Sequence, residues 1–271
     1  MKRAVAALVG CALLSVAVAC GNGNIEDGVR IVLQADLSDL PQGTDSDEAM
    51  DDVREVLERR LKAFNLDFEI DIDGADQLTV TVADVSPDEA RDLVGKTAEL
   101  EFRAPVTDDL GQIVCETPGA GTYAVAFQPG GFLEDKSNNA MTCPPNDEGK
   151  AGVVKWEPAT GTDSEGDHRA LNGSYLKPNA SVIGPPTTVA IEFTTEGGLL
   201  FEQITGELVG LPLAIFLDDE MIGAPTVQQA ITGGQASISG LGEDESRTLA
   251  IQLNAGALPV PLKAVSIEEI P

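Results

Sequence analysis

Few side chains in this sequence have the type and spacing needed for catalysis or metal binding. One histidine, His168, lies in a segment rich in Gly and Asp, so a Ser-His-Asp triad or a histidine-based zinc site would have to use it. The sequence contains no G-x-S-x-G and no C-x-x-C motif. The Gly-rich run at 119–122 lacks the Lys-Ser/Thr of a phosphate-binding loop. We therefore expect an exposed loop histidine, no catalytic residues, no metal and no cofactor, in a protein that is not an enzyme.

An acidic ladder formed by Asp67, Glu69, Asp71 and Asp73 suggests a calcium loop at first sight. With Glu69 at the first position, the twelfth position is Val80, whereas such a loop needs a bidentate Glu there. Apolar residues alternate with these acids, which is typical of a half-buried strand with a solvated face. We favour the strand over the calcium site.

The first twenty residues have the pattern of an export signal. Lys2 and Arg3 precede an apolar run at 4–19, which is short for a membrane-spanning helix and typical of a signal peptide. The run ends at Cys20 in a sequence that resembles a lipoprotein signal, so we predict cleavage before Cys20 and attachment of lipid to it. The alternative is an uncleaved membrane anchor. Both place the rest of the chain outside the cytoplasm, at the membrane surface.

Two further cysteines, Cys115 and Cys143, remain after such cleavage. In an oxidising compartment they form a plausible disulfide, which would stabilise the fold by about 3 kcal/mol through the entropy of the unfolded chain. The alternative is a pair of separately buried thiols.

The net charge excludes one class of partner. The chain has 45 acidic and 17 basic residues, for a formal charge of -28. Such a chain repels nucleic-acid phosphates, so we expect no nucleic-acid binding.

The first half shows the element order of a small α+β unit. Apolar stripes and capping signals predict two helices, and alternation of apolar and polar residues predicts strands. The order is βαββαβ, which is typical of a ferredoxin-like unit with antiparallel strands. The predicted strands lie at 29–37, 68–72, 78–82 and 98–102, and the helices begin near Asp45 and Ser86.

The chain is rich in Gly and Pro from 105 to 186, where we expect loops and short strands. Regular patterns return after this segment. They predict strands at 189–193, 213–217 and 265–270, helices at 196–209 and 243–254, and a turn at Asp218–Asp219.

Several segments of the chain resemble SecD, an accessory subunit of the bacterial Sec protein-export machinery. They occur in the family's order along the chain, with a weaker match at 171–176. The matching segments are 28–34, 95–103, 201–205, 213–218, 223–227, 233–240 and 254–262, the last containing GALPVPL. Two departures are Asp218–Asp219 in place of the family's Asp-Gly turn, and a Gly-rich segment reduced to Gly28.

The resemblance implies the extracytoplasmic P1 domain of that family, an α+β fold in which a head subdomain is inserted into a ferredoxin-like base. It implies a non-enzymatic role in Sec-dependent translocation, with an exported polypeptide as ligand. The implied partners are the SecY complex, SecF or a full-length SecD. We expect a signal at 1–19, a lipid-anchored linker at 20–27, the base at 28–104, a divergent head segment at 105–186, the head at 187–242 and a return helix and strand to the base at 243–271.

The family carries proton-coupling transmembrane helices after P1, and this sequence ends at Pro271, so we expect no proton coupling of its own. The alternative function is a P1-like lipoprotein that has been reused to bind another envelope partner or ligand.

The head-like segment also supplies a hypothesis for the binding site. We predict that Phe201, Ile204, Phe216 and Met221 contribute to an apolar surface that holds unfolded polypeptide, since Met-containing apolar surfaces adapt to varied partners. The alternative, which we favour, is that all four belong to the ordinary core of the head.

Overall fold

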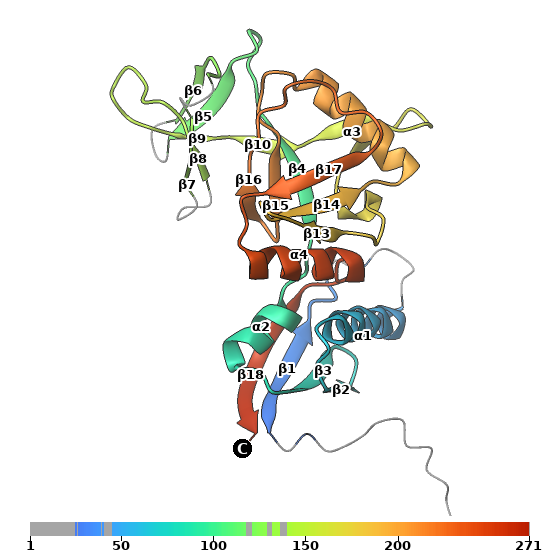
Figure 1. The fold of residues 1–271 in the computed structure, drawn as a ribbon. Helices are drawn as coiled ribbons and strands as arrows, with labels where there is room; N and C mark the ends of the chain where they lie inside the picture. Colours follow the sequence, from blue (N-terminus) through green and yellow to red (C-terminus); the bar gives the residue numbers. More distant parts are fainter. Residues whose placement is uncertain are drawn as a thin grey trace, which may run out of the picture.

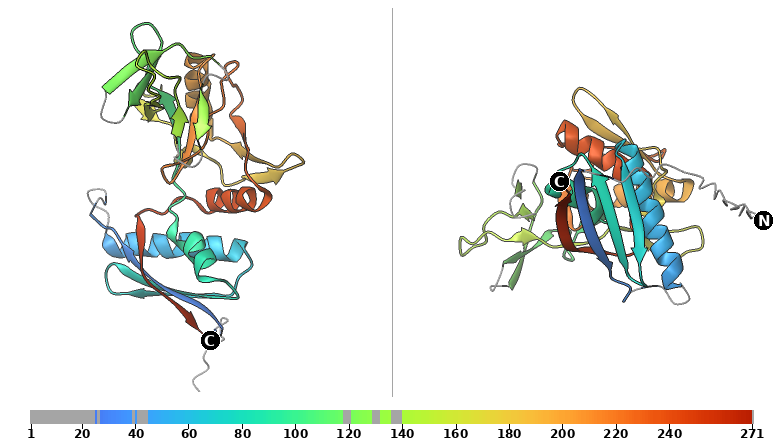
Figure 2. Two further views of the ribbon diagram at one scale, coloured as in Figure 1. Left: turned by 90° about the vertical axis from the view of Figure 1, so that its left-hand side faces the viewer. Right: turned by 90° about the horizontal axis from the view of Figure 1, so that it is seen from below.

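The computed structural model describes residues 25, 27–38, 40, 45–117, 121–128, 132–135 and 140–270. The predicted signal peptide, Cys20 and most of the predicted linker lie outside the described residues. The molecule is elongated, with a base at one end, a head at the other and a small sheet beside the head (Figure 1). Helix α4 lies between the base and the head, and the chain crosses the narrow waist in two places (Figure 2).

The base is an antiparallel sheet of order β18-β1-β3-β2 with two helices packed on it. Both helices begin as their sequences predict: Asp45 caps α1, and Ser86 forms a capping box with Glu89 at the start of α2. The sheet and helices bury an aliphatic core that includes Ile31, Leu57 and Val80. The elements are β1 (Gly28–Ala35), α1 (Ser46–Ala63), β2 (Phe68–Asp73), β3 (Gln77–Ala83), α2 (Pro87–Gly95) and β18 (Leu262–Ile270).

One strand of the base differs from the sequence prediction. The strand predicted at 98–102 is β4 (Leu100–Pro105), and it pairs with strands of the head. The fourth strand of the base is β18, which pairs with β1 from Gly28–Ile270 to Ala35–Leu262. Ala98 has a φ of 58° just where the chain leaves the base. Alternation identifies a strand without identifying its sheet, because the same face can be buried against either core.

The head has two antiparallel sheets and one main helix around a second core. The first sheet has the order β13-β14-β17, and the second has the order β10-β4-β15-β16. Leu249, Ala250 and Leu253 of α4 join this core, so α4 packs on the head and also contacts α1. The elements are β10 (Trp156–Pro158), β13 (Ser181–Ile183), β14 (Thr188–Glu192), α3 (Thr195–Glu207), β15 (Ala214–Leu217), β16 (Glu220–Gly223), β17 (Gln235–Ser239) and α4 (Glu243–Ala255).

The Gly/Pro-rich segment folds into short strands. Five of them form a small sheet of order β6-β5-β9-β8-β7, whose core also takes in Phe216 and Met221. A hairpin of two further strands packs against α3, ahead of a short 3-10 turn. The elements are β5 (Ile113–Thr117), β6 (Gly121–Val125), β7 (Leu133–Asp135), β8 (Ala140–Thr142), β9 (Val153–Val154), β11 (Thr160–Thr162), β12 (His168–Ala170) and η1 (Gly173–Tyr175). The predicted fold class, α+β with antiparallel sheets and a ferredoxin-like base, is confirmed.

Candidate functional site

The waist between base and head is organised by Arg60, a fully buried side chain on α1. Its guanidinium donates to the carbonyl oxygens of Lys96, of Thr97 at 2.8 Å and of Gly256 at 3.2 Å. These carbonyls belong to the two segments that connect the base with the head. Burial lowers the pKa of Arg60 to about 10, and nearby Asp218 acts in the opposite direction. One base side chain therefore holds both connections.

Asp218 completes the waist from the side of the head. Its Oδ1 accepts from the hydroxyl of Thr97 and, at 3.0 Å, from the backbone N–H of Glu99. Asp218 and Asp219 both have positive φ, at 51° and 63°, which is the backbone that a tight hairpin turn requires. The turn between β15 and β16 thus presents one carboxylate to the connecting segment.

A group of charges lies beside this turn. Arg103 on β4 pairs with Glu101 and Asp219, and its guanidinium carbon lies 4.2 Å from the centre of the Phe216 ring. Partial burial of Glu99, together with the carboxylates of Glu101, Asp219 and Asp218, raises the pKa of Glu99. The negative charge of the carboxylates at the waist therefore exceeds the positive charge of its two arginines.

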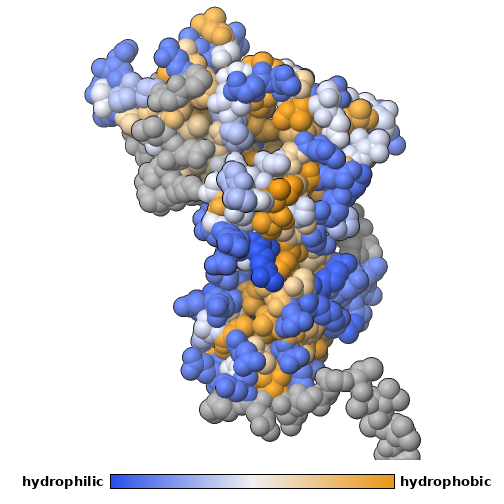
Figure 3. Space-filling view, viewed as in Figure 1, coloured by the Kyte–Doolittle hydropathy of each residue, from blue (hydrophilic) through white to orange (hydrophobic). Residues whose placement is uncertain are grey.

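A cleft of about 760 Å³ opens at the waist between the base and the head. Its base side comes from the end of α1 and from the segment 84–96 that contains α2. Its head side comes from the β15–β16 hairpin and from α4. The waist in Figure 3 shows apolar atoms beside strongly hydrophilic ones. This combination of depth, apolar surface and charge makes the cleft a candidate binding site.

A second, smaller recess of about 290 Å³ lies within the head. Its walls are strand β17, the 225–231 segment and parts of β4, β14, β15 and α3. The lining is mainly apolar, with Phe102, Phe201 and Ile215 among its residues, and exposed Gln228 and Gln229 also line it. We call this recess the head groove.

The four residues of the binding hypothesis are buried, with exposed fractions of 3% for Phe201 and Ile204, 4% for Phe216 and 5% for Met221. Phe201 and Ile204 belong to the core of the head, whereas Phe216 and Met221 belong to the core shared with the small sheet. The structure thus separates them into two pairs, and their burial favours the core alternative. Phe201 also lines the head groove, and Met221 lines the cleft at the waist.

Cys115 and Cys143 form a disulfide across the small sheet, with Cα atoms 6.3 Å apart. Both cysteines are buried, at 0% and 2% exposure. The bridge links β5 to the end of β8, so it holds together a sheet of very short strands.

Within the described part of the chain, His168 does not join a cluster of metal-ligating side chains. His168 is exposed on β12, and Asp71 of the acidic ladder is exposed on β2. Among the described residues, Asp163, Glu165 and Asp167 in the β11–β12 turn lie close enough together to hold a metal ion.

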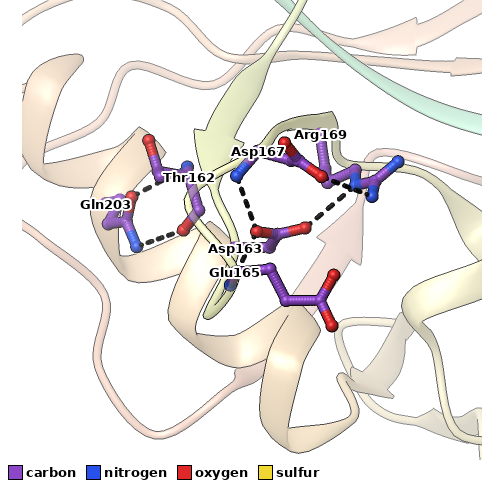
Figure 4. Close-up of polar contacts among 6 residues, drawn as sticks. All are labelled: Thr162, Asp163, Glu165, Asp167, Arg169 and Gln203. Atoms are coloured by element: carbon purple, nitrogen blue, oxygen red, sulfur yellow. Dashed lines mark hydrogen bonds and ion pairs between the residues drawn. The ribbon is translucent and has the colours of Figure 1, made fainter.

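Figure 4 shows that the carboxylate of Asp163 is already occupied. It accepts from the backbone N–H groups of Glu165 and Asp167, at 2.9 and 2.8 Å, and from Arg169 at 2.9 Å. Gln203 of α3 exchanges two hydrogen bonds with the backbone of Thr162. This acidic cluster therefore shapes a hairpin that is fastened to α3.

Known proteins resemble most of the chain. A family model described as the P1 head subdomain of SecDF matches residues 167–260. The chain is 33% identical over 252 residues to the protein translocase subunit SecDF of Thermus thermophilus, covering 91% of this chain and 31% of that protein. It is 27% identical over 252 residues to the protein translocase subunit SecD of Elusimicrobium minutum, covering 89% of this chain and 51% of that protein. The chain thus spans about a third to a half of these relatives.

Solved structures of SecDF also match this chain. A crystal structure of SecDF in a super-membrane-facing form matches with a TM-score of 0.60 and 27% identity, covering 91% of this chain and 30% of that chain. A structure of SecDF, described as a membrane component that enhances protein export, matches with a TM-score of 0.59 and 27% identity. That match covers 88% of this chain and 99% of the other. Among the described residues, no helix combines the length and apolar character needed to cross a membrane.

Proposed function

We propose that this chain, which resembles the P1 region of the SecD family in sequence and fold, assists Sec-dependent protein export by binding exported polypeptide on the extracytoplasmic side of the membrane. The observation that carries the proposal is the match to 99% of the solved chain in a structure of SecDF, a membrane component described as enhancing protein export. The proposed partners are the translocating preprotein and the Sec translocon, through the SecY complex, SecF or a full-length SecD. The proposed role is binding, without catalysis and without proton coupling.

The head groove supports a binding role. Its lining is mainly apolar. An unfolded polypeptide exposes apolar side chains, which can pack against such a lining. Phe201, one of the four residues predicted from sequence, lines the groove and packs with Phe193, with ring centres 4.8 Å apart. We propose that Phe201 and Ile204 support the groove from the core side, and that Phe216 and Met221 do the same for the hairpin at the cleft.

We also propose that the N-terminus ties this region to the membrane through lipid on Cys20, at the extracytoplasmic face of the cell membrane. The signal-like sequence supports this proposal. Mass spectrometry of the protein from a membrane fraction tests it, since a lipid-modified Cys20 peptide is expected. An N-terminal peptide that begins at Met1 would contradict it.

Binding to an unfolded chain tests the main proposal. Fluorescence anisotropy of a labelled secretory protein, kept unfolded by reduction and alkylation, is expected to show binding, whereas the native form of that protein should not bind. Ala236→Phe, which fills the head groove, is expected to weaken binding. Ala124→Phe, at an exposed position of β6, is the matched control. Absence of binding to any unfolded chain, with specific capture of one envelope protein, would favour reuse of the fold instead.

A further inference from the structure

The cleft between base and head has an unusual lining. Seven carboxylates line it, against a single ammonium group, that of Lys96. Lys96 is itself paired with Asp92 at 3.7 Å, so the cleft retains an excess of negative charge. The carboxylates belong to Asp84, Glu89, Asp92, Asp218, Glu220, Asp244 and Glu245.

Not all of these carboxylates serve the fold. Glu89 and Glu245 accept hydrogen bonds at the starts of α2 and α4. Asp84, Glu220 and Asp244 are exposed, and none of them forms an ion pair within the described part of the chain. They come from the base, from β16 and from α4, so they reach the cleft from three sides. Their charge is available to a ligand.

Apolar side chains lie among these charges. They come from both bodies, so a ligand in the cleft would contact the base and the head together. The apolar residues of the lining are Phe64, Leu66, Val85, Leu93, Leu217, Met221, Ile222, Leu241 and Leu249. A ligand that fits this surface needs apolar groups next to cationic ones.

Two buried polar atoms of the lining lack a partner in the described structure. The side-chain nitrogen of Gln252, a residue only 2% exposed, has no acceptor, and Oδ2 of Asp218 has no donor. Each such atom costs free energy as long as it is unsatisfied. A peptide group carries one acceptor and one donor, so the backbone of a bound polypeptide offers what these two atoms lack.

We propose that the cleft between base and head binds an extended polypeptide segment in which Lys or Arg side chains stand beside apolar ones. The apolar residues fill the cleft, and the basic residues pair with Asp84, Glu220 and Asp244. The inference rests on the proposed function for the nature of the ligand, and it adds a second contact and a preference among polypeptide segments. A basic-apolar segment binds more tightly than an acidic-apolar segment of equal length.

A pair of triple variants tests the cleft. Asp84→Asn, Glu220→Gln and Asp244→Asn remove its three free charges. Asp71→Asn, Glu116→Gln and Glu268→Gln remove three exposed charges elsewhere, with the same change in net charge. The probes are two labelled peptides of about sixteen residues, one built from Lys, Leu, Gly and Ser and the other with Glu in place of Lys. Anisotropy titrations at low and moderate salt give the dissociation constants.

The wild type is expected to prefer the Lys peptide. The cleft variant is expected to bind it about tenfold more weakly, from three lost exposed pairs, while the control variant stays within about twofold of wild type. A photoreactive group on the Lys peptide is expected to crosslink to the 241–252 segment. Equal weakening by both triple variants would overturn the inference, because net charge alone would then explain the preference.

Two further results separate the inference from the proposed function. If both triple variants bind the Lys peptide as wild type does, polypeptide is bound elsewhere, and the cleft assignment fails while the export role stands. If neither the peptides nor an unfolded protein binds to the wild type, the proposed function itself fails, and the inference fails with it.

Discussion

The guanidinium of Arg60, in the base, lies 2.8 Å from the carbonyl oxygen of Thr97, in the segment that enters the head. The same side chain reaches the carbonyl of Gly256, on the segment that returns from the head. Thr97 and Gly256 are far apart in sequence, so a single residue ties together the two crossings of the waist.

Replacement of Arg60 by Met tests the importance of this tie. The carbonyl oxygens of Lys96, Thr97 and Gly256 lose the guanidinium donor, and within the described residues only that of Thr97 keeps another donor, the backbone N–H of Leu258 at 2.9 Å. We therefore expect the free energy of unfolding to fall by about 3 kcal/mol. Urea denaturation measures the change, and hydrogen exchange at 96–99 shows whether the crossing loosens first. Arg59→Met is the control, because Arg59 is half-exposed and its one ion pair among the described residues is with Glu55 at the surface. Equal stability of the two variants would contradict the role assigned to Arg60.

Glu99 gives a pH-dependent prediction. Its pKa is raised by partial burial and by the neighbouring carboxylates, so the folded state disfavours its ionised form. The stability that it contributes is therefore complete below its unfolded pKa of about 4.3 and is lost as the pH rises through the folded value. Glu99→Gln is expected to be more stable than wild type at pH 7, with the difference vanishing near pH 4. Thermal unfolding at several pH values measures this.

Glu116→Gln is the matched control for Glu99, since Glu116 is exposed on β5 and the change in net charge is the same. If both substitutions stabilise the protein equally at pH 7, the relief of general negative charge explains the effect, and the local account of Glu99 is wrong.

Two glycines of α3 are expected to respond to alanine in opposite ways. A Cβ on Gly197 would lie 2.6 Å from Cβ of Tyr175 and 2.9 Å from its carbonyl oxygen. A Cβ on Gly206 would meet Cβ of Ala230 at an ordinary 3.7 Å. Gly206→Ala should therefore stabilise the protein by about 0.5–1 kcal/mol, as alanine does in a helix, whereas Gly197→Ala should destabilise it. Stabilisation by both would show that η1 yields to the added methyl group.

The disulfide is expected to stabilise the small sheet in particular. Its cysteines are 28 residues apart, so their replacement by Ser in the double variant should cost about 3–4 kcal/mol in that sheet. Trp156 provides a local probe, because it is the single tryptophan and lies 6.3 Å from the ring of Phe216. Its fluorescence should change at lower urea than the circular dichroism of the helices. Coincident, unshifted transitions would show that the sheet needs no bridge.

The local elements of the fold could be predicted from sequence, and so could the return of the last strand to the base, whereas the sheet of the strand at Leu100 could not. Capping residues such as Asp45 and Ser86 mark helix starts through contacts made within a few residues. The alternation of apolar and polar residues predicts the strand that begins at Leu100. Its pairing with Ala214–Leu217 depends on contacts between residues far apart in the sequence. Which sheet the strand joins depends on which core has a complementary surface, and a single sequence does not contain that information.

The candidate site was predicted in part. Phe201 and Met221 do lie at the two recesses, and the burial of all four residues agrees with the core alternative that their apolar character also indicated. The role of Arg60 was missed, although the sequence holds a signal for it: Arg60 falls on the same helical stripe as Val53, Val56 and Leu57. A charge on an apolar stripe indicates a buried partner. The cleft itself arises from two bodies meeting, so no local pattern could show it.

Photo-crosslinking in cells tests the central claim, that this protein holds polypeptide during export. Photoreactive residues at exposed Gln228 and Gln229, beside the head groove, are compared with one at Asp71 on the base sheet, using a translocation-stalled secretory protein. We predict crosslinks from the head positions to the stalled chain, which disappear when translocation is blocked upstream, and none from Asp71. Persistent crosslinks from the head to a different envelope protein, with none to the stalled chain, would contradict the account.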